Sequence, residues 1–76
     1  MFYSGDKLIA IDKYEMPSGK KLLTIGKEYQ VDIVHYKDLT FSITDDYGRE
    51  IVIEFEEAKK LFDLDNIILS KGDLKG

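Results

Sequence analysis

The chain has 76 residues, no cysteine and a formal net charge of −4. A chain of this length forms one domain whose core supplies only about 3–5 kcal/mol of stability, and without cysteine neither a disulfide nor a thiolate metal site can add to it. The excess of acid disfavours binding to nucleic-acid phosphates and favours protein partners with basic patches. No apolar run is long enough to span a bilayer and no signal-peptide pattern opens the chain, so we expect a cytoplasmic protein.

The first expected strand covers Lys7–Lys13. Because side chains alternate between the two faces of a strand, Leu8 and Ala10 share one face, and Ile9 and Ile11 share the other. Both faces are therefore apolar, which predicts that both are covered or that one binds a partner.

A long loop is expected to follow, from Tyr14 to Gly26. Pro17 and Gly19 mark its tip, since these residues favour turns. Some of the apolar residues in its second half must fold back onto the body of the domain.

The second expected strand runs from about Lys27 to Tyr36. Tyr29, Val31 and Ile33 share the inner face in this pattern, and Val34 lies on the outer face. The outer face is polar up to Val34, which makes that residue an exception in need of an explanation.

The third expected strand, Leu39–Thr44, places Leu39, Phe41 and Ile43 inside and the intervening threonines and serine outside. The segment Asp45–Gly48 predicts a tight hairpin, because Gly48 suits the left-handed position that closes a type I turn with a bulge.

The fourth expected strand, Glu50–Phe55, places alternate apolar residues inside. Apolar spacing then changes to that of a helix over Glu56–Leu64, with acidic residues first and lysines after them. We expect a fifth strand at Asn66–Ser70. The domain thus covers residues 1–70, and residues 71–76 form a flexible tail.

Three stretches carry a resemblance to a known group of proteins: Gly5–Leu8, Leu23–Val31 and Ile43–Gly48. They resemble the small Src-homology-3-like barrel proteins of bacteriophages and bacterial mobile elements. In that group a Gly-Lys-x-Tyr-x-Val segment starts a meander of strands, and an acidic turn with glycine links the central ones. The resemblance implies a mainly β fold, a small five-stranded barrel with one short helix before the last strand.

The same resemblance implies a role in modulating a host protein, and hence a place in the host cell cytoplasm for a phage-encoded chain. Recognition of polyproline does not carry over, because the chain has no tryptophan to grip such a ligand. The loop Tyr14–Ile25 also lacks the acidic and aromatic pattern of the peptide-binding domains.

The leading functional hypothesis is a non-enzymatic protein–protein interaction module that binds a protein partner or a second copy of itself. It would bind through an exposed strand edge or through an outward surface of apolar and tyrosine side chains, Ile9, Ile11, Val34, Tyr36 and Val52. A monomer would not leave such a contiguous patch exposed. Two readings stay open: the patch binds a partner, or the helix or the C-terminal segment covers it.

The alternative hypothesis is a small barrel that binds nucleic acid through the long loop. Its lysines would track phosphates and its tyrosine would stack on a base, in the set Lys13, Tyr14, Lys20, Lys21 and Lys27. A solubilising lysine loop on an acidic protein is the competing explanation.

Catalysis and metal binding find no support in the pattern. His35 is the only histidine, and no serine near it stands in a nucleophile motif. Asp63–Asn66 begins like a calcium loop, but Ile67 occupies the next ligand position. We therefore expect no enzymatic activity, no cofactor and no bound metal.

Overall fold

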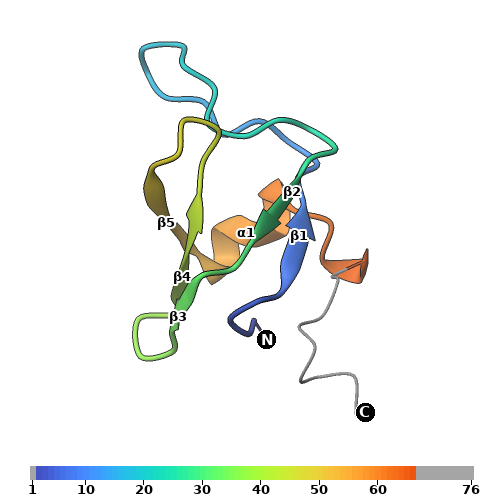
Figure 1. Cartoon of the computed structure of the whole chain (residues 1–76), viewed down its shortest axis with the longest axis vertical. Helices are drawn as coiled ribbons and strands as arrows, with labels where there is room; N and C mark the ends of the chain where they lie inside the picture. Colours follow the sequence, from blue (N-terminus) through green and yellow to red (C-terminus); the bar gives the residue numbers. More distant parts are fainter. Residues whose placement is uncertain (1, 67–76) are drawn as a thin grey trace.

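The structure is a computed structural model that describes residues 2–66 (Figure 1). The fold is mainly β, with five strands in two antiparallel sheets and one short helix. The elements are β1 (Lys7–Ile9), β2 (Glu28–Gln30), β3 (Ile33–His35), β4 (Thr40–Thr44), β5 (Glu50–Glu54), α1 (Phe55–Leu61) and the 3₁₀ turn η1 (Leu64–Asn66). No helix in this part of the chain is long and apolar enough to cross a membrane.

The two sheets pack around one core. β1 pairs with β2, and β4 lies between β3 and β5 in the second sheet. Phe41 sits at the centre of β4, fully buried, with its ring centroid 4.7 Å from that of Phe2 and 6.4 Å from that of Phe62. Within residues 2–66 the two sheets do not close into a barrel. An isolated bridge between Ala10 and Phe62 joins the end of β1 to the segment after α1.

The second expected strand is interrupted, and this overturns the predicted orientation of Val34. Asp32 and Ile33 both face Ser42: the Asp32 amide donates to the Ser42 carbonyl at 2.9 Å, and the Ile33 amide donates to Ser42 Oγ at 3.3 Å. Two residues opposite one form a β-bulge, which shifts the alternation by one position. Val34 consequently faces inward, pairs with Phe41 and packs against the core, while Ile33 is 52% exposed.

Leu39 also departs from its predicted inward position. It has a φ of 56° and is 59% exposed, because it closes the turn between β3 and β4 instead of extending β4. The predicted hairpin after β4 is confirmed. Gly48 has a φ of 80°, and its amide donates to the Asp45 carbonyl at 3.1 Å.

Helix α1 begins one residue earlier than expected and ends three residues earlier, at Leu61. It follows β5 without a loop and turns Ala58 and Leu61 into the core. Phe62 then returns to an extended conformation and bridges to Ala10. Of the expected fifth strand, Asn66 belongs to η1 and residues 67–70 lie outside the described residues, as does the expected tail.

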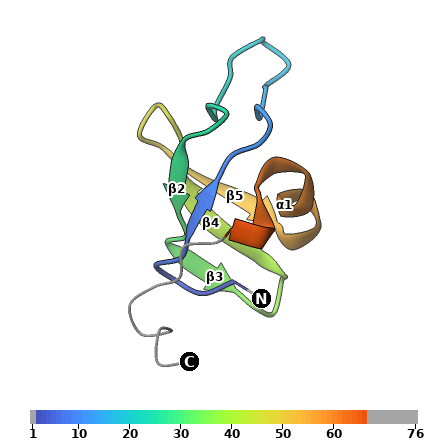
Figure 2. The same ribbon diagram turned by 90° about the vertical axis from the view of Figure 1, so that its right-hand side faces the viewer.

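The long loop between β1 and β2 extends beyond both sheets (Figure 2). Its stem is held by an antiparallel bridge between Glu15 and Lys21. Leu22 and Leu23 are buried, which confirms that the second half of the loop folds back onto the body. The expected first strand is shorter than predicted, because regular pairing ends at Ile9 where this loop departs.

Candidate interaction surface

The structure does not bring the five predicted partner-binding residues together. Val34 belongs to the core, and Ile9, half-buried, lies on the β1–β2 sheet, whereas Val52 lies on the other sheet. Ile11 is 50% exposed beyond the end of β1. The Tyr36 ring is exposed, with its hydroxyl donating to the Phe2 carbonyl at 2.8 Å.

A smaller apolar row does cross the outer face of the three-stranded sheet. The register places Ile33 and Val52 on either side of Ser42. Val52 is 56% exposed, and Ser42 is buried between its two larger neighbours. The sequence pattern placed Ile33 on the inner face, because the alternation of apolar and polar residues gives no sign of the bulge at Asp32.

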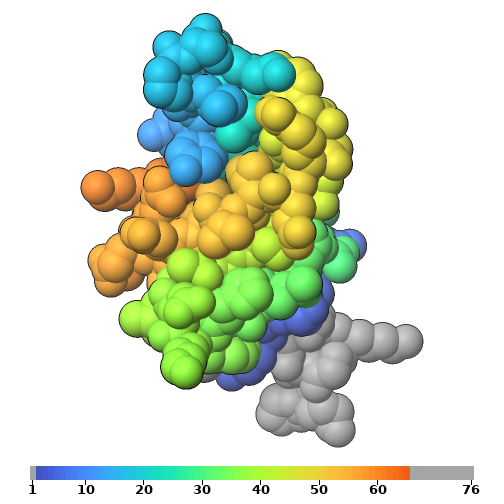
Figure 3. Space-filling view, turned by 90° about the vertical axis from the view of Figure 1, so that its left-hand side faces the viewer, coloured from blue at the N-terminus to red at the C-terminus, as the bar shows by residue number. Residues whose placement is uncertain are grey.

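Beside Val52, the long loop and β5 enclose an apolar hollow of about 250 Å³. Its lining comes from both stems of the loop and from β5, and consists of Tyr14, Glu15, Met16, Pro17, Leu22, Ile51 and Val52. We call this hollow the loop–β5 groove. Figure 3 shows the loop in blue, β5 in gold and α1 in orange on one face of the molecule. Of the predicted partner-binding residues, only Val52 lies in this groove.

Sequence reasoning missed the loop side of the groove. Met16 is 41% exposed next to Pro17, and its amide donates to the Lys20 carbonyl across the turn of the long loop. Met16 does not belong to the buried core cluster. This was the available signal, since flexible Met side chains are common on binding surfaces.

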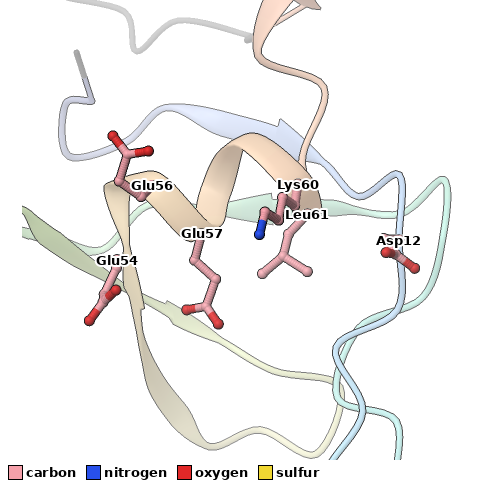
Figure 4. A pocket seen from close by; sticks show the side chains of 6 residues that line it. All are labelled: Asp12, Glu54, Glu56, Glu57, Lys60 and Leu61. Carbon is pink, nitrogen blue, oxygen red and sulfur yellow. The ribbon is translucent and has the colours of Figure 1, made fainter.

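A second, larger hollow of about 420 Å³ lies between α1 and the start of the long loop, and it is acidic. It is lined by Asp12, Glu54, Glu56, Glu57, Lys60 and Leu61. Figure 4 shows Glu54 and Glu57 pointing to the same side of the ribbon, away from Glu56. Within the described residues no three Asp, Glu, His or Cys side chains form a group that could hold a metal ion.

Tyr14 links the two hollows. Its side chain lines the loop–β5 groove, and the carboxylates of Glu57 and Glu54 lie near its hydroxyl. Burial, together with the nearby Glu57 carboxylate, raises the pKa of the Tyr14 phenol. The phenol therefore stays neutral across the physiological range and keeps a hydroxyl that can donate a hydrogen bond at the edge of the acidic hollow.

The lysine and tyrosine residues of the nucleic-acid hypothesis do not share one surface. Lys13 and Lys21 line a hollow of about 280 Å³, but Tyr14 lies in the loop–β5 groove instead. Lys20 places its ammonium 4.3 Å from the Tyr47 ring centroid, and Lys27 is paired with Asp46 at 2.9 Å.

Asp46 anchors the long loop to the β4–β5 hairpin. Its carboxylate accepts hydrogen bonds from Thr24 Oγ1 at 2.6 Å, from the Tyr29 hydroxyl at 2.6 Å and from Lys27 Nζ at 2.9 Å. The Asp46 amide also donates to the Leu22 carbonyl at 3.0 Å. The bonds from Thr24 and Tyr29 lower the pKa of Asp46 from 3.8 to about 2. This network holds one wall of the groove in place.

We expect Asp46→Asn to lower the free energy of unfolding by about 1–2 kcal/mol at neutral pH, because charge-assisted hydrogen bonds are lost. The folded-state pKa lies below the unfolded one, so the ionised carboxylate stabilises the fold above pH 3.8, and this contribution is lost as the pH falls toward 2. The difference between wild type and Asp46→Asn in urea unfolding should therefore shrink over that range. Asp38→Asn, on an exposed turn, is the control; an Asp46→Asn difference that stays constant with pH would refute the assignment.

In a comparison with known proteins, no protein-family model matches the chain, and neither a curated protein nor a solved structure matches it significantly.

Proposed function

We propose that this chain is a non-enzymatic protein-interaction module whose binding surface is the loop–β5 groove. The observation that carries the proposal is an apolar hollow next to the exposed Val52, with acidic side chains beside it. An apolar centre with a polar rim is typical of protein-binding surfaces. Met16 and Tyr14 add a flexible and an amphipathic side chain to the same hollow.

The finer fold prediction, a five-stranded Src-homology-3-like barrel, remains part of this proposal. The bridge between Ala10 and Phe62 supports it, because it brings the segment after α1 beside the end of β1. Modulation of a host protein by a phage-type chain rests on the resemblance of the turn and strand segments alone.

The nucleic-acid alternative has less support in the geometry. Phosphate binding needs several cations that converge on one surface, and only Lys13 and Lys21 share a hollow. Asp46 lines that same hollow and places a carboxylate beside them. A protein partner is therefore the favoured class of ligand.

We expect a displayed library of random peptides, selected on the immobilised protein, to yield binders that depend on Met16. Met16→Asp should weaken these binders about tenfold or more, since a charge in the centre of an apolar contact is poorly tolerated. Ile25→Asp is the matched control, because Ile25 is 62% exposed on the same loop but lies outside the groove.

Fluorescence titration of the selected peptides against both variants gives the affinities. Binders that lose equal affinity in both variants, or a library that yields none, would contradict the proposed groove. Binding of single-stranded oligonucleotides that falls steeply with salt would favour the nucleic-acid alternative.

A further inference from the structure

The outer edge of β5 has hydrogen-bonding groups that no described residue uses. The Asp45 amide donates to the Arg49 carbonyl and the Phe55 amide to the Leu39 carbonyl, which sets the alternation of the antiparallel ladder. In that alternation Ile51 and Ile53 bond to β4, so the N–H and C=O groups of Glu50 and Val52 point away from it. Backbone bonds in the facing loop run from Met16 to Lys20 and from Leu22 to Tyr14, and the Leu22 carbonyl accepts from Asp46 in the β4–β5 hairpin. None of the described bonds of this loop reaches Glu50 or Val52.

The open edge runs alongside the loop–β5 groove. Ile51 and Val52 line the groove from β5, and Met16 and Leu22 line it from the loop. A strand added to this edge would have alternate side chains directed toward the groove and toward solvent. Strand β5 has five residues, which sets the length of the segment that it can pair with.

The solvent face of β5 selects the charge of that segment. Glu50, Val52 and Glu54 share this face, and the first and last are exposed carboxylates. Glu56 and Glu57 follow at the start of α1, so the surface at the C-terminal end of β5 is also acidic. Basic residues directly opposite these glutamates would be stabilising.

The same charges disfavour a second copy of the chain. If two β5 strands paired antiparallel about Val52, Glu50 of each would face Glu54 of the other. Like charges directly opposite on a sheet are destabilising. The edge is thus protected against self-pairing in the way that charged edge strands commonly are.

We propose that β5 binds an extended segment of a partner protein as an added antiparallel strand. Basic side chains of the segment lie opposite Glu50 and Glu54, and its alternate apolar side chains enter the loop–β5 groove. This mode of recognition, strand addition to a free sheet edge, derives affinity from backbone hydrogen bonds and specificity from alternate side chains. The inference rests on the proposed function and specifies its binding mode and its ligand.

The test uses a capped peptide of sequence Gly-Lys-Leu-Val-Leu-Lys-Gly and its counterpart with glutamate in place of each lysine. We expect the lysine peptide to bind at least about fivefold more tightly, because two cross-strand charge pairs change from attractive to repulsive. Proton–nitrogen NMR titration measures affinity, and the amides of Glu50 and Val52 should gain protection from hydrogen exchange in the complex.

N-methylation of the peptide tests the backbone pairing without altering the protein. A methyl on the central valine removes an N–H that faces β5 and should weaken binding about tenfold. A methyl on either leucine, whose N–H faces away, should have a much smaller effect. Equal effects at both positions, equal affinity of the lysine and glutamate peptides, or no binding at millimolar peptide would overturn strand addition.

Charge variants of the protein provide the second arm. The pair Glu50→Gln and Glu54→Gln should reduce the preference for the lysine peptide about fivefold. The pair Glu28→Gln and Asp65→Asn changes the net charge equally at positions away from β5 and should leave the preference intact.

Two outcomes separate this inference from the function on which it rests. If library peptides depend on Met16 but do not distinguish the β5 variants, the groove binds protein without strand addition. Light scattering tests for self-association. A stable dimer that becomes more stable in the β5 charge variants would show that a second copy occupies the edge, and it would contradict the proposal that the partner is a different protein.

Discussion

Phe41→Ala should unfold the domain. Replacing a large buried aromatic by alanine lowers the free energy of unfolding by about 3–5 kcal/mol, and a single-core domain of this size has about that much in total. Phe41 is fully buried on the central strand β4 and contacts aromatic rings from three other segments, Phe2, Phe55 and Phe62. Phe41 thus joins the N-terminal segment, the helix and the segment after it to the central strand.

Circular dichroism and urea titration followed by tyrosine fluorescence measure this effect. Phe41→Leu keeps most of the apolar volume and should remain folded with a loss of about 1–2 kcal/mol. Tyr3→Ala is the control and should be close to neutral, because it removes a half-exposed ring and keeps the hydrogen bonds of the Tyr3 backbone with Asp6. A folded Phe41→Ala protein with a cooperative transition like that of the wild type would refute this view of the core.

The second large effect is expected at Asp45, which organises the hairpin between β4 and β5. Its side chain is fully buried, and Oδ1 accepts hydrogen bonds from the backbone amides of Tyr47 and Arg49, both at 2.9 Å. Asp45→Ala leaves these amides without their acceptor. A hydrogen bond to a charged group contributes about 1.5–3 kcal/mol, so the loss of these two bonds should lower the free energy of unfolding by about 3–6 kcal/mol, measured by urea unfolding.

Asp45→Asn separates turn geometry from charge. The amide oxygen can still accept both backbone bonds, but it gives up the attraction between Oδ2 and Arg49 Nε, which are 3.7 Å apart. Oδ2 has no hydrogen-bond partner among the described residues. We expect a loss of about 1 kcal/mol for this variant. A variant with asparagine as unstable as the one with alanine would mean that the charge, not the Asx turn, holds the hairpin.

Local patterns predicted the hairpin and most of the core. Gly48 adopts the positive φ that the turn requires, and Ile43 and Ile53 alternate inward as expected. These features depend on residues close together in sequence, where turn chemistry and the period of two act directly. Helix α1 was predicted for the same reason. Its end was not, because Phe62 leaves the helix to bridge to Ala10, which is far away in the sequence.

The inversion of Val34 and Ile33 could not be predicted, because it depends on how the chain passes from one sheet to the other. Val31 exchanges backbone bonds with the N-terminal segment, at Gly5 and Asp6, while Asp32 bonds to Ser42 in the second sheet. A bulge allows both sets of hydrogen bonds to form, and it exchanges the faces of the sheet on which Ile33 and Val34 lie. Part of the predicted binding patch was misplaced for this reason.

The candidate site likewise has features that local sequence patterns predict and features that depend on contacts between distant segments. Composition and alternation are local properties, and they sufficed to predict a small, acidic, mainly β domain with Val52 as an outward apolar residue of its strand. The joining of Met16, Tyr14 and Leu22 with Val52 in one groove, and the unpaired edge of β5 beside it, became visible in the folded chain alone. The physical reason is that a groove forms between segments some 30 positions apart in the sequence, held by long-range bonds such as those of Asp46, which no local pattern encodes.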